Sequence, residues 1–167
     1  MSWRRLDERV AYAGWRRVLA RSFETPDGVR ELEVKQEPDA AAVVALTPTR
    51  EVVLVREFRP GPEAWLLELP GGVVDEGEEP AAAAQRELLE ETGYDGEPRS
   101  VGAYVDCAYS TRVRYVFVVE GAQRIADSSE ALEIVLLPLD GFRDHLRSGR
   151  LTDVAAGYLA LDALGLL

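Results

Sequence analysis

The sequence predicts an α/β protein of the α+β type, in which a mixed β-sheet is packed between helices. Three observations support this. Apolar, strand-like runs such as 40–46 are joined by short connections of hairpin length, and the segment 80–92 has strong helix propensity. The two kinds of element do not alternate strictly along the chain. With 167 residues, 47% of them hydrophobic, the chain is suited to one globular domain.

The N-terminal part predicts a β-hairpin. An aromatic, charge-rich stretch at 12–23 is followed by the turn signal Pro26-Asp27-Gly28 and by the alternating segment 29–34. Next come two strands joined by a short turn, and then a shorter strand that ends at Pro70-Gly71-Gly72. These three strands are expected at 40–46, 52–58 and 65–69.

The helix at 80–92 is the clearest element of the chain. Proline suits a first helical turn, the four alanines and the Gln-Arg-Glu-Leu-Leu-Glu-Glu run favour a helix, and Gly93 supplies a C-terminal stop. Two helices are expected to close the chain, one at 139–148 and one that begins at Thr152 or Asp153, where either side chain could cap it. Further strands are expected at 100–105, 113–119 and 132–137.

Composition excludes several classes of function. A formal net charge of −11 argues against a nucleic acid or an anionic membrane surface as the main partner, because both require a positive surface. No run approaches the roughly 20 apolar residues of a membrane span, and the first residues lack a signal-peptide pattern, so we expect a cytoplasmic protein. Cys107 is the only cysteine, which excludes an intramolecular disulfide, and we expect it to be buried.

The helix at 80–92 gathers glutamates on one face. At about 100° per residue, Glu87, Glu90 and Glu91 share an arc of roughly 100°. Like charges at this spacing repel one another, and a bound dication would reverse the sign of that interaction. Magnesium favours such an all-oxygen donor set. The alternative is a solvated acidic face paired with residues such as Arg86.

The segments beside the helix favour the metal site. Gly71 and Gly72 permit a close approach of the main chain, so that carbonyl or amide groups there could reach a metal or a phosphate. Glu78 adds a carboxylate in the loop that enters the helix. A glycine-rich loop that leads into an acidic helix is able to build a metal-phosphate site.

The stretch GGVVDEGEEPAAAAQRELLEETGY resembles the Nudix box, the signature of the Nudix hydrolases. Eight residues fall on its defining positions, and Tyr94 departs from it only in being aromatic where an aliphatic residue is usual. The resemblance implies an α/β/α sandwich and metal-dependent hydrolysis of a diphosphate bond. The eight matching residues are Gly72, Glu78, Arg86, Glu87, Leu88, Glu90, Glu91 and Gly93.

The resemblance also implies roles for these residues. Glu87 and Glu91 would be the principal ligands of Mg²⁺, or of Mn²⁺ as a substitute, with Glu90 contributing directly or through water. Gly71 would offer its carbonyl oxygen, and Glu78 would hold the helix or bind metal through water. Arg86 would orient the glutamates through ion pairs.

Beyond the box, the chain resembles the ADP-ribose pyrophosphatase branch of the family. The segments VREFRP and WLLELPGG match that branch, in which the arginine at the position of Arg59 contacts substrate phosphates and aromatic residues near Trp15 help to stack adenine. The segment SSEALEIVLLPLD makes Glu130 the candidate general base, with Glu133 second. The alternative for both glutamates is that they simply begin an edge strand.

One loop departs from that branch. The segment 107–112 lacks the usual proline and acidic residues, and Arg112 reverses the local charge, which could favour another sugar or an additional phosphate. ADP-ribose and other nucleotide sugars therefore both stay open as substrates. So do nucleoside triphosphates, dinucleoside polyphosphates and a non-catalytic nucleotide-sensing module.

The family also predicts a homodimer, in which residues 1–39 form an N-terminal hairpin and dimerisation layer and residues 40–167 form the hydrolase domain. The expected partner is a small nucleotide. His145, the only histidine, is expected to be a solvated helical residue without a catalytic role.

Overall fold

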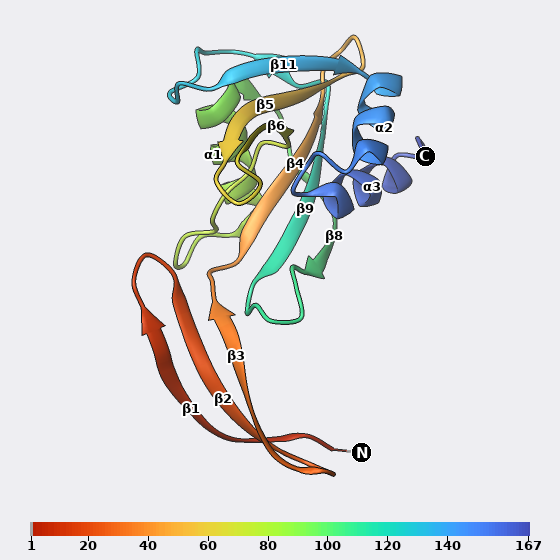
Figure 1. Cartoon of the computed structure of the whole chain (residues 1–167). Helices are drawn as coiled ribbons and strands as arrows, with labels where there is room; N and C mark the ends of the chain where they lie inside the picture. Colours follow the sequence, from red (N-terminus) through yellow and green to blue (C-terminus); the bar gives the residue numbers. More distant parts are fainter. Residues whose placement is uncertain (1) are drawn as a thin grey trace. The chain divides into compact units, whose positions relative to one another are not determined.

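A computed structural model of the chain describes residues 2–167 (Figure 1). It contains three helices and eleven strands among these residues. The strands are β1 (Arg4–Ala13), β2 (Arg17–Thr25), β3 (Gly28–Gln36), β4 (Ala40–Leu46), β5 (Glu51–Arg59), β6 (Ala64–Glu68), β7 (Tyr94–Asp95), β8 (Arg99–Val105), β9 (Val113–Glu120), β10 (Gln123–Arg124) and β11 (Glu133–Pro138). The helices are α1 (Pro80–Thr92), α2 (Leu139–Ser148) and α3 (Val154–Ala163).

A six-stranded sheet forms the centre of the larger compact unit, residues 40–103 and 115–167. Its order is β11-β5-β4-β9-β8, and β6 also pairs with β5. All seven residues of β4 are buried, as expected for a strand covered on both faces. Ala41, Val43 and Ala45 pack against α1, while α2 and α3 cover the opposite face of the sheet (Figure 1).

The predicted fold class is confirmed, and several elements match closely. Helices α1 and α2 have the expected bounds, and Gly93 ends α1 with a left-handed φ of 72°. The expected cap of the last helix is wrong in one respect. Asp153 occupies the N-cap position of α3, but its side chain makes no capping hydrogen bond, because its φ of −100° and ψ of 43° lie outside the extended geometry of a capping residue.

The N-terminal region is a three-stranded antiparallel sheet rather than a hairpin alone. Residues 2–39 and 104–114 form a second compact unit, in which β1 pairs with β2 and β2 with β3. Strand β1 was not predicted because register shifts between Arg5 and Asp7 and between Val10 and Tyr12 interrupt the period-2 alternation. All ten residues of β1 are exposed.

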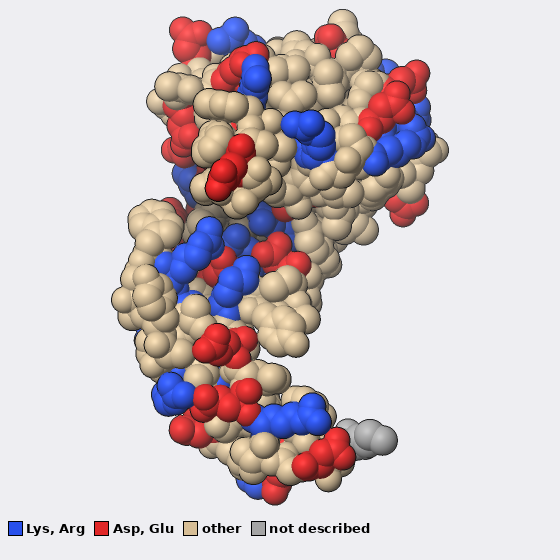
Figure 2. All heavy atoms as spheres, viewed as in Figure 1, with Lys and Arg blue, Asp and Glu red and all other residues tan. Residues whose placement is uncertain are grey.

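Charged side chains of both signs are interspersed on the face shown in Figure 2. In the N-terminal sheet many of them form cross-strand ion pairs, such as Arg4 with Glu24 at 2.8 Å and Arg21 with Glu8 at 2.6 Å. Such exposed pairs contribute little stability each, about 0–1 kcal/mol. No helix among residues 2–167 is long and apolar enough to cross a membrane.

Candidate active site

Two glycines bring the loop after β6 against the glutamates of α1. A Cβ atom on Gly71, whose φ is 155°, would strike the carbonyl oxygen of Ala41 in β4. One on Gly72 would strike the carboxylate of Glu87. This close approach lets the amide of Gly71 donate a hydrogen bond to Glu91 Oε2 at 3.0 Å. The loop is therefore fixed directly beside the acidic face of the helix.

Arg86 connects three of the carboxylates. Its Nε and Nη2 atoms lie 3.0 and 2.9 Å from the two carboxylate oxygens of Glu78, and its Nη1 lies 2.8 Å from Glu87 Oε1 and 3.2 Å from Glu90 Oε2. Nη2 also donates to the carbonyl oxygen of Val73 at 3.0 Å. These contacts raise the pKa of Arg86, and its hydrogen bonds hold the pKa of Glu78 below the usual range. The ion pairs expected of Arg86 are thus present.

Burial and acidic neighbours disfavour the ionised forms of Glu91 and Glu87. Glu91 is only 8% exposed, and burial raises its pKa to about 8, with repulsion from Glu87, Glu130 and Glu57 adding to the shift. Burial also raises the pKa of Glu87, despite its contact with Arg86. Both carboxylates therefore lie where a cation would be strongly stabilised.

A serine-anchored loop places Glu130 beside this cluster. Ser128 Oγ lies 2.9 and 2.8 Å from the carbonyl oxygens of Glu90 and Glu91, which share its hydroxyl hydrogen, and the amide of Ser129 donates to Glu90 O at 2.9 Å. The loop is thereby tied to the last turn of α1, whose carbonyls have no partner within the helix. Glu130 comes close enough for its charge to raise the pKa values of Glu87 and Glu91.

The two serines were not identified from the sequence. Their only signal is their position just before Glu130, since a serine that binds a distant helix end has no local pattern. Glu133, the second candidate base, faces the other way. It pairs with Arg56 at 3.2 Å, whereas its neighbour Ile134 packs against the core cluster that includes α1.

Arg59 is held by two acidic side chains. Its Nη1 lies 2.9 Å from Glu57 Oε1, and its Nε lies 3.3 Å from Glu68 Oε1. Glu57 is near enough to raise the pKa of Glu91, so Arg59 lies at the margin of the glutamate cluster. Arg59 was expected from the sequence, but its partners Glu57 and Glu68 were not.

Glu68 is a buried anchor, with 1% of its surface exposed. Its second oxygen accepts hydrogen bonds from the amide and the hydroxyl of Thr152, at 2.9 and 2.8 Å. A buried carboxylate is tolerated when it is fully hydrogen-bonded in this way. Glu68 thus joins Arg59 to the turn that precedes α3.

The donor set fits a divalent metal ion, although it is not preassembled. Among residues 2–167, no three His, Cys, Asp or Glu side chains converge in a metal-binding arrangement. Arg86 engages Glu78, Glu87 and Glu90 instead. The remaining features, buried and half-buried carboxylate oxygens with raised pKa values and a glycine approach that a Cβ atom would block, match the preferences of a hard dication.

Other expected residues lie in the N-terminal unit. Trp15 is in the turn between β1 and β2 and is 97% exposed, and Arg112 donates through Nε to the carbonyl oxygen of Pro38 at 2.8 Å. Their predicted roles in substrate binding stay predictions. Cys107 is exposed, so the expectation that it is buried is wrong, because the loop that carries it lies at the surface.

His145 also differs from expectation. It is half-buried on α2, and its Nε2 atom lies 2.8 Å from the carbonyl oxygen of Leu67. A helical pattern alone does not show that a neighbouring strand end reaches this side chain.

Comparison with known proteins identifies relatives along most of the chain. A sequence model described as the NUDIX domain matches residues 36–154. A CMP-5'-(N-acetyl-N-hydroxy-3-aminopropyl)phosphonate hydrolase from Streptomyces rubellomurinus (strain ATCC 31215) is 32% identical over 181 residues, covering 99% of this chain and 84% of that protein. An ADP-ribose pyrophosphatase from Bacillus subtilis (strain 168) is 29% identical over 149 residues, covering 84% and 80%.

A solved structure shares the fold. The crystal structure of an ADP compounds hydrolase superposes with a TM-score of 0.81, covering 100% of this chain and 98% of that one, at 22% sequence identity.

Proposed function

Because the chain belongs to the NUDIX family, we propose that it is a metal-dependent hydrolase that cleaves the diphosphate bond of a nucleoside diphosphate derivative. The observation that carries the proposal is the pair Glu87 and Glu91, two half-buried to buried carboxylates whose pKa values are raised by burial and by neighbouring carboxylates. A purely structural acidic face would be solvated or paired. Here Glu91 is buried with a single amide donor, and Glu87 shares Arg86 with Glu78 and Glu90, which favours a site for a cation and its anionic substrate.

Nudix hydrolases use divalent metal ions, and we propose Mg²⁺ for this chain, with Mn²⁺ as a substitute. Glu87, Glu90 and Glu91 would hold the ion, together with the carbonyl oxygen of Gly71 and, through water, Glu78. When bound, the ion supplies positive charge that polarises the diphosphate and neutralises the charge of the leaving phosphate.

The chain's own residues would supply the remaining chemistry. Water attacks one phosphorus, its new O–P bond replaces the bridging P–O bond, and the other phosphate leaves. Glu130, which lies beside Glu87 and Glu91, would accept the proton from that water. Arg59 would bind the diphosphate through its planar guanidinium, and Arg86 would keep the glutamates oriented.

We propose ADP-ribose or another nucleotide sugar as the substrate, giving a nucleoside monophosphate and a sugar phosphate. The relative that cleaves ADP-ribose supports this proposal, and the relative named for a CMP derivative leaves the choice of base open. Arg112 and Trp15 would contribute to binding, Arg112 by its charge and Trp15 by stacking on the base. The cytoplasmic location stays a prediction.

We also propose a homodimer formed through residues 1–39, with residues 40–167 as the hydrolase domain. Strand β1 and its neighbours expose large apolar side chains that a monomer would leave in water, among them Trp3, Tyr12 and Trp15. Exposed apolar clusters of this kind are typical of interaction surfaces. Sedimentation of the native protein and of the Tyr12→Ser variant would test this, with a dimer expected only for the native protein.

The function is tested by a hydrolysis screen. The panel includes ADP-ribose, other nucleotide sugars, dinucleoside polyphosphates and nucleoside triphosphates, each with Mg²⁺, Mn²⁺ or a chelator. We expect metal-dependent release of AMP from ADP-ribose or of another monophosphate from its nucleotide sugar, and its loss in Glu91→Gln. Preferred cleavage of triphosphates would correct the substrate class, and nucleotide binding without any hydrolysis would instead indicate a sensing module.

A further inference from the structure

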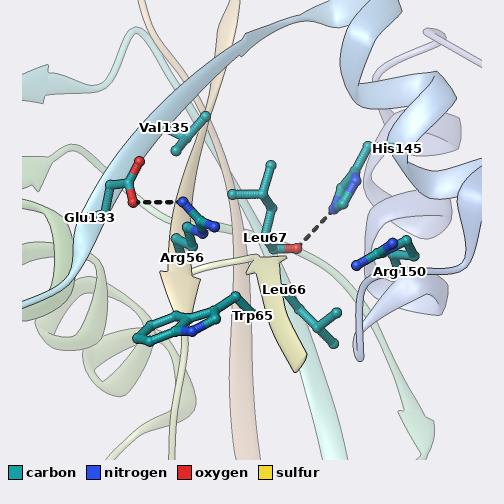
Figure 3. A pocket seen from close by; sticks show the side chains of 8 residues that line it. All are labelled: Arg56, Trp65, Leu66, Leu67, Glu133, Val135, His145 and Arg150. Carbon is teal, nitrogen blue, oxygen red and sulfur yellow. Dashed lines mark hydrogen bonds and ion pairs between the residues drawn. The ribbon is translucent and has the colours of Figure 1, made fainter. Parts of the chain in front are cut away.

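A cavity of about 410 Å³ lies on the side of strands β5 and β6 opposite the glutamates (Figure 3). Strand alternation separates the two sites. Glu57 and Arg59 point toward the glutamate cluster, whereas Arg56, which precedes Glu57 on β5, points into the cavity. The cavity is open to solvent and is lined by residues of β5, β6, β11 and α2 and of the turn before α3. Its lining residues are Arg56, Trp65, Leu66, Leu67, Glu133, Val135, His145 and Arg150.

The cavity is basic in a chain whose net charge is −11. The guanidinium of Arg150 points into it, and within residues 2–167 that group has no hydrogen-bond or ion-pair partner (Figure 3). Arg56 is paired with Glu133 at 3.2 Å, and both side chains are about half exposed. His145 is engaged through Nε2, which donates to the carbonyl oxygen of Leu67. The unpaired positive charge is therefore on the Arg150 side.

The other side of the cavity is aromatic. The indole of Trp65 is 59% exposed, and its position is fixed by an edge contact with Phe58, with ring centroids 5.7 Å apart, and by Arg56, 5.9 Å from its ring centroid. A large aromatic side chain held in place but left open is suited to stacking on a flat ring. Leu67 and Val135 form an apolar floor between the two sides.

We propose that this cavity is a second ligand site, which binds a nucleoside monophosphate. The base would stack on the Trp65–Arg56 side, and the phosphate would be held by the guanidinium of Arg150. The volume falls in the lower part of the range for small-molecule pockets, about 300–1,000 Å³, which suits one mononucleotide. The site needs no metal, and its existence does not depend on the proposed hydrolase activity.

The test measures ligand binding through the fluorescence of Trp65 alone. The chain has three tryptophans, so a Trp3→Phe, Trp15→Phe background leaves Trp65 as the single indole fluorophore. AMP is titrated into this protein in the presence of a chelator. We expect a saturable change in Trp65 fluorescence, and at least about a tenfold loss of affinity in Arg150→Gln, which removes one charge-assisted contact.

Three controls make the result specific. Arg147→Gln removes an exposed arginine of α2 that is paired with Asp144 outside the cavity, and it should leave AMP binding unchanged. Arg59→Gln should also leave the Trp65 signal unchanged, which separates this site from the glutamate cluster. Inorganic phosphate and adenosine, tested separately, should each bind much more weakly than AMP.

The proposal is overturned if AMP gives no Trp65 signal, or if the signal survives Arg150→Gln. Equal affinity for inorganic phosphate and AMP would also overturn it, because the cavity would then be an anion site without a base subsite. A cooperative thermal unfolding transition close to that of the parent protein, measured in parallel, shows that the Arg150→Gln variant is folded.

Discussion

Two regions of the molecule contain a carboxylate shielded from water, and the chain treats them in opposite ways. In the N-terminal unit, Glu37 has an 8% exposed side chain that contacts Arg16 at 2.9 Å, Lys35 at 3.0 Å and the hydroxyl of Ser110 at 2.7 Å. Burial alone would raise its pKa, but Ser110, Lys35 and Arg112 lower it below the usual range. In the larger unit, Glu91 receives one amide hydrogen bond and faces three other carboxylates.

The two carboxylates, Glu37 and Glu91, have different roles. Glu37 is balanced by its own chain, and it fixes the loop that carries Ser110 and Thr111, whose hydroxyl donates to Glu37 O at 2.9 Å. Glu91 receives only the amide hydrogen bond of Gly71 among the contacts described for residues 2–167. Ionisation of this buried carboxylate therefore costs stability unless a cation binds there. The lowered pKa of Glu37 thus accompanies a structural anchor, and the raised pKa of Glu91 accompanies a candidate site.

The largest expected effect is on turnover, at Glu130, whose charge helps to raise the pKa of Glu91. Glu130→Gln should lower turnover by roughly two or more orders of magnitude, with little change in substrate binding, because the variant keeps its shape but cannot accept a proton. Steady-state kinetics with the best substrate of the screen would measure this. Glu133→Gln is the matched control, since Glu133 faces Arg56, and its rate should stay near that of the native protein. An unaffected rate in Glu130→Gln would remove Glu130 from the mechanism.

A smaller effect is expected at Glu68, a buried carboxylate that resembles Glu37 in being fully bonded. Glu68→Gln should raise KM about tenfold with a lesser effect on kcat, because Arg59 loses its buried partner and is no longer held in position. Thr152→Val is the control. It removes one hydrogen bond from Glu68 without touching Arg59, so it should lower stability but leave KM unchanged. Equal KM values in all three proteins would show that Glu68 has only a structural role.

At Glu37 the expected effect is on stability. Glu37→Gln should lower the free energy of unfolding by about 1–3 kcal/mol at neutral pH, since Lys35 and Arg16 lose their shared anion. The folded pKa of Glu37 is lowered, so its contribution is present above the ordinary pKa and is lost as pH falls through the folded value. Urea titrations at neutral and at acidic pH should therefore show a difference that shrinks on acidification. A difference independent of pH would contradict the pairing.

In the absence of metal, an effect of the opposite sign on stability is expected at Glu91. The unfolded chain loses this proton near pH 4.5, whereas the folded protein keeps it until about pH 8, so stability falls as pH rises between these values. Glu91→Gln should remove that loss. In chelator at about pH 9 the variant should melt a few degrees above the native protein, and the difference should vanish at about pH 4.

Addition of Mg²⁺ provides the control for that measurement. The metal should stabilise the native protein and leave Glu91→Gln almost unchanged, because only the native protein offers the full set of carboxylates. A lower melting temperature of the variant at high pH in chelator would show that ionised Glu91 stabilises the folded protein. Glu91 would then behave like Glu37, and the proposed contrast between them would be wrong.

Much of the fold and the centre of the site could be predicted from the sequence. Helix α1 has an uninterrupted propensity pattern with a proline near its start and a glycine stop, and its glutamates share one face through helical periodicity alone. Strand β1 could not be predicted, because two register shifts break its alternation. The cap of α3 could not be predicted either, because the backbone angles of Asp153 are set by the turn that Glu68 holds.

The sequence by itself determined the acidic helix, its glycine-rich entry and the family, since all of these lie within one contiguous segment whose geometry is local. Only the tertiary structure decided what surrounds that segment. Ser128 binds the end of α1 from 37 residues away, Glu68 reaches Thr152 across 84, and the cavity joins Trp65 to Arg150. Such contacts depend on sheet register and on how loops close over the core, and no local periodicity specifies either.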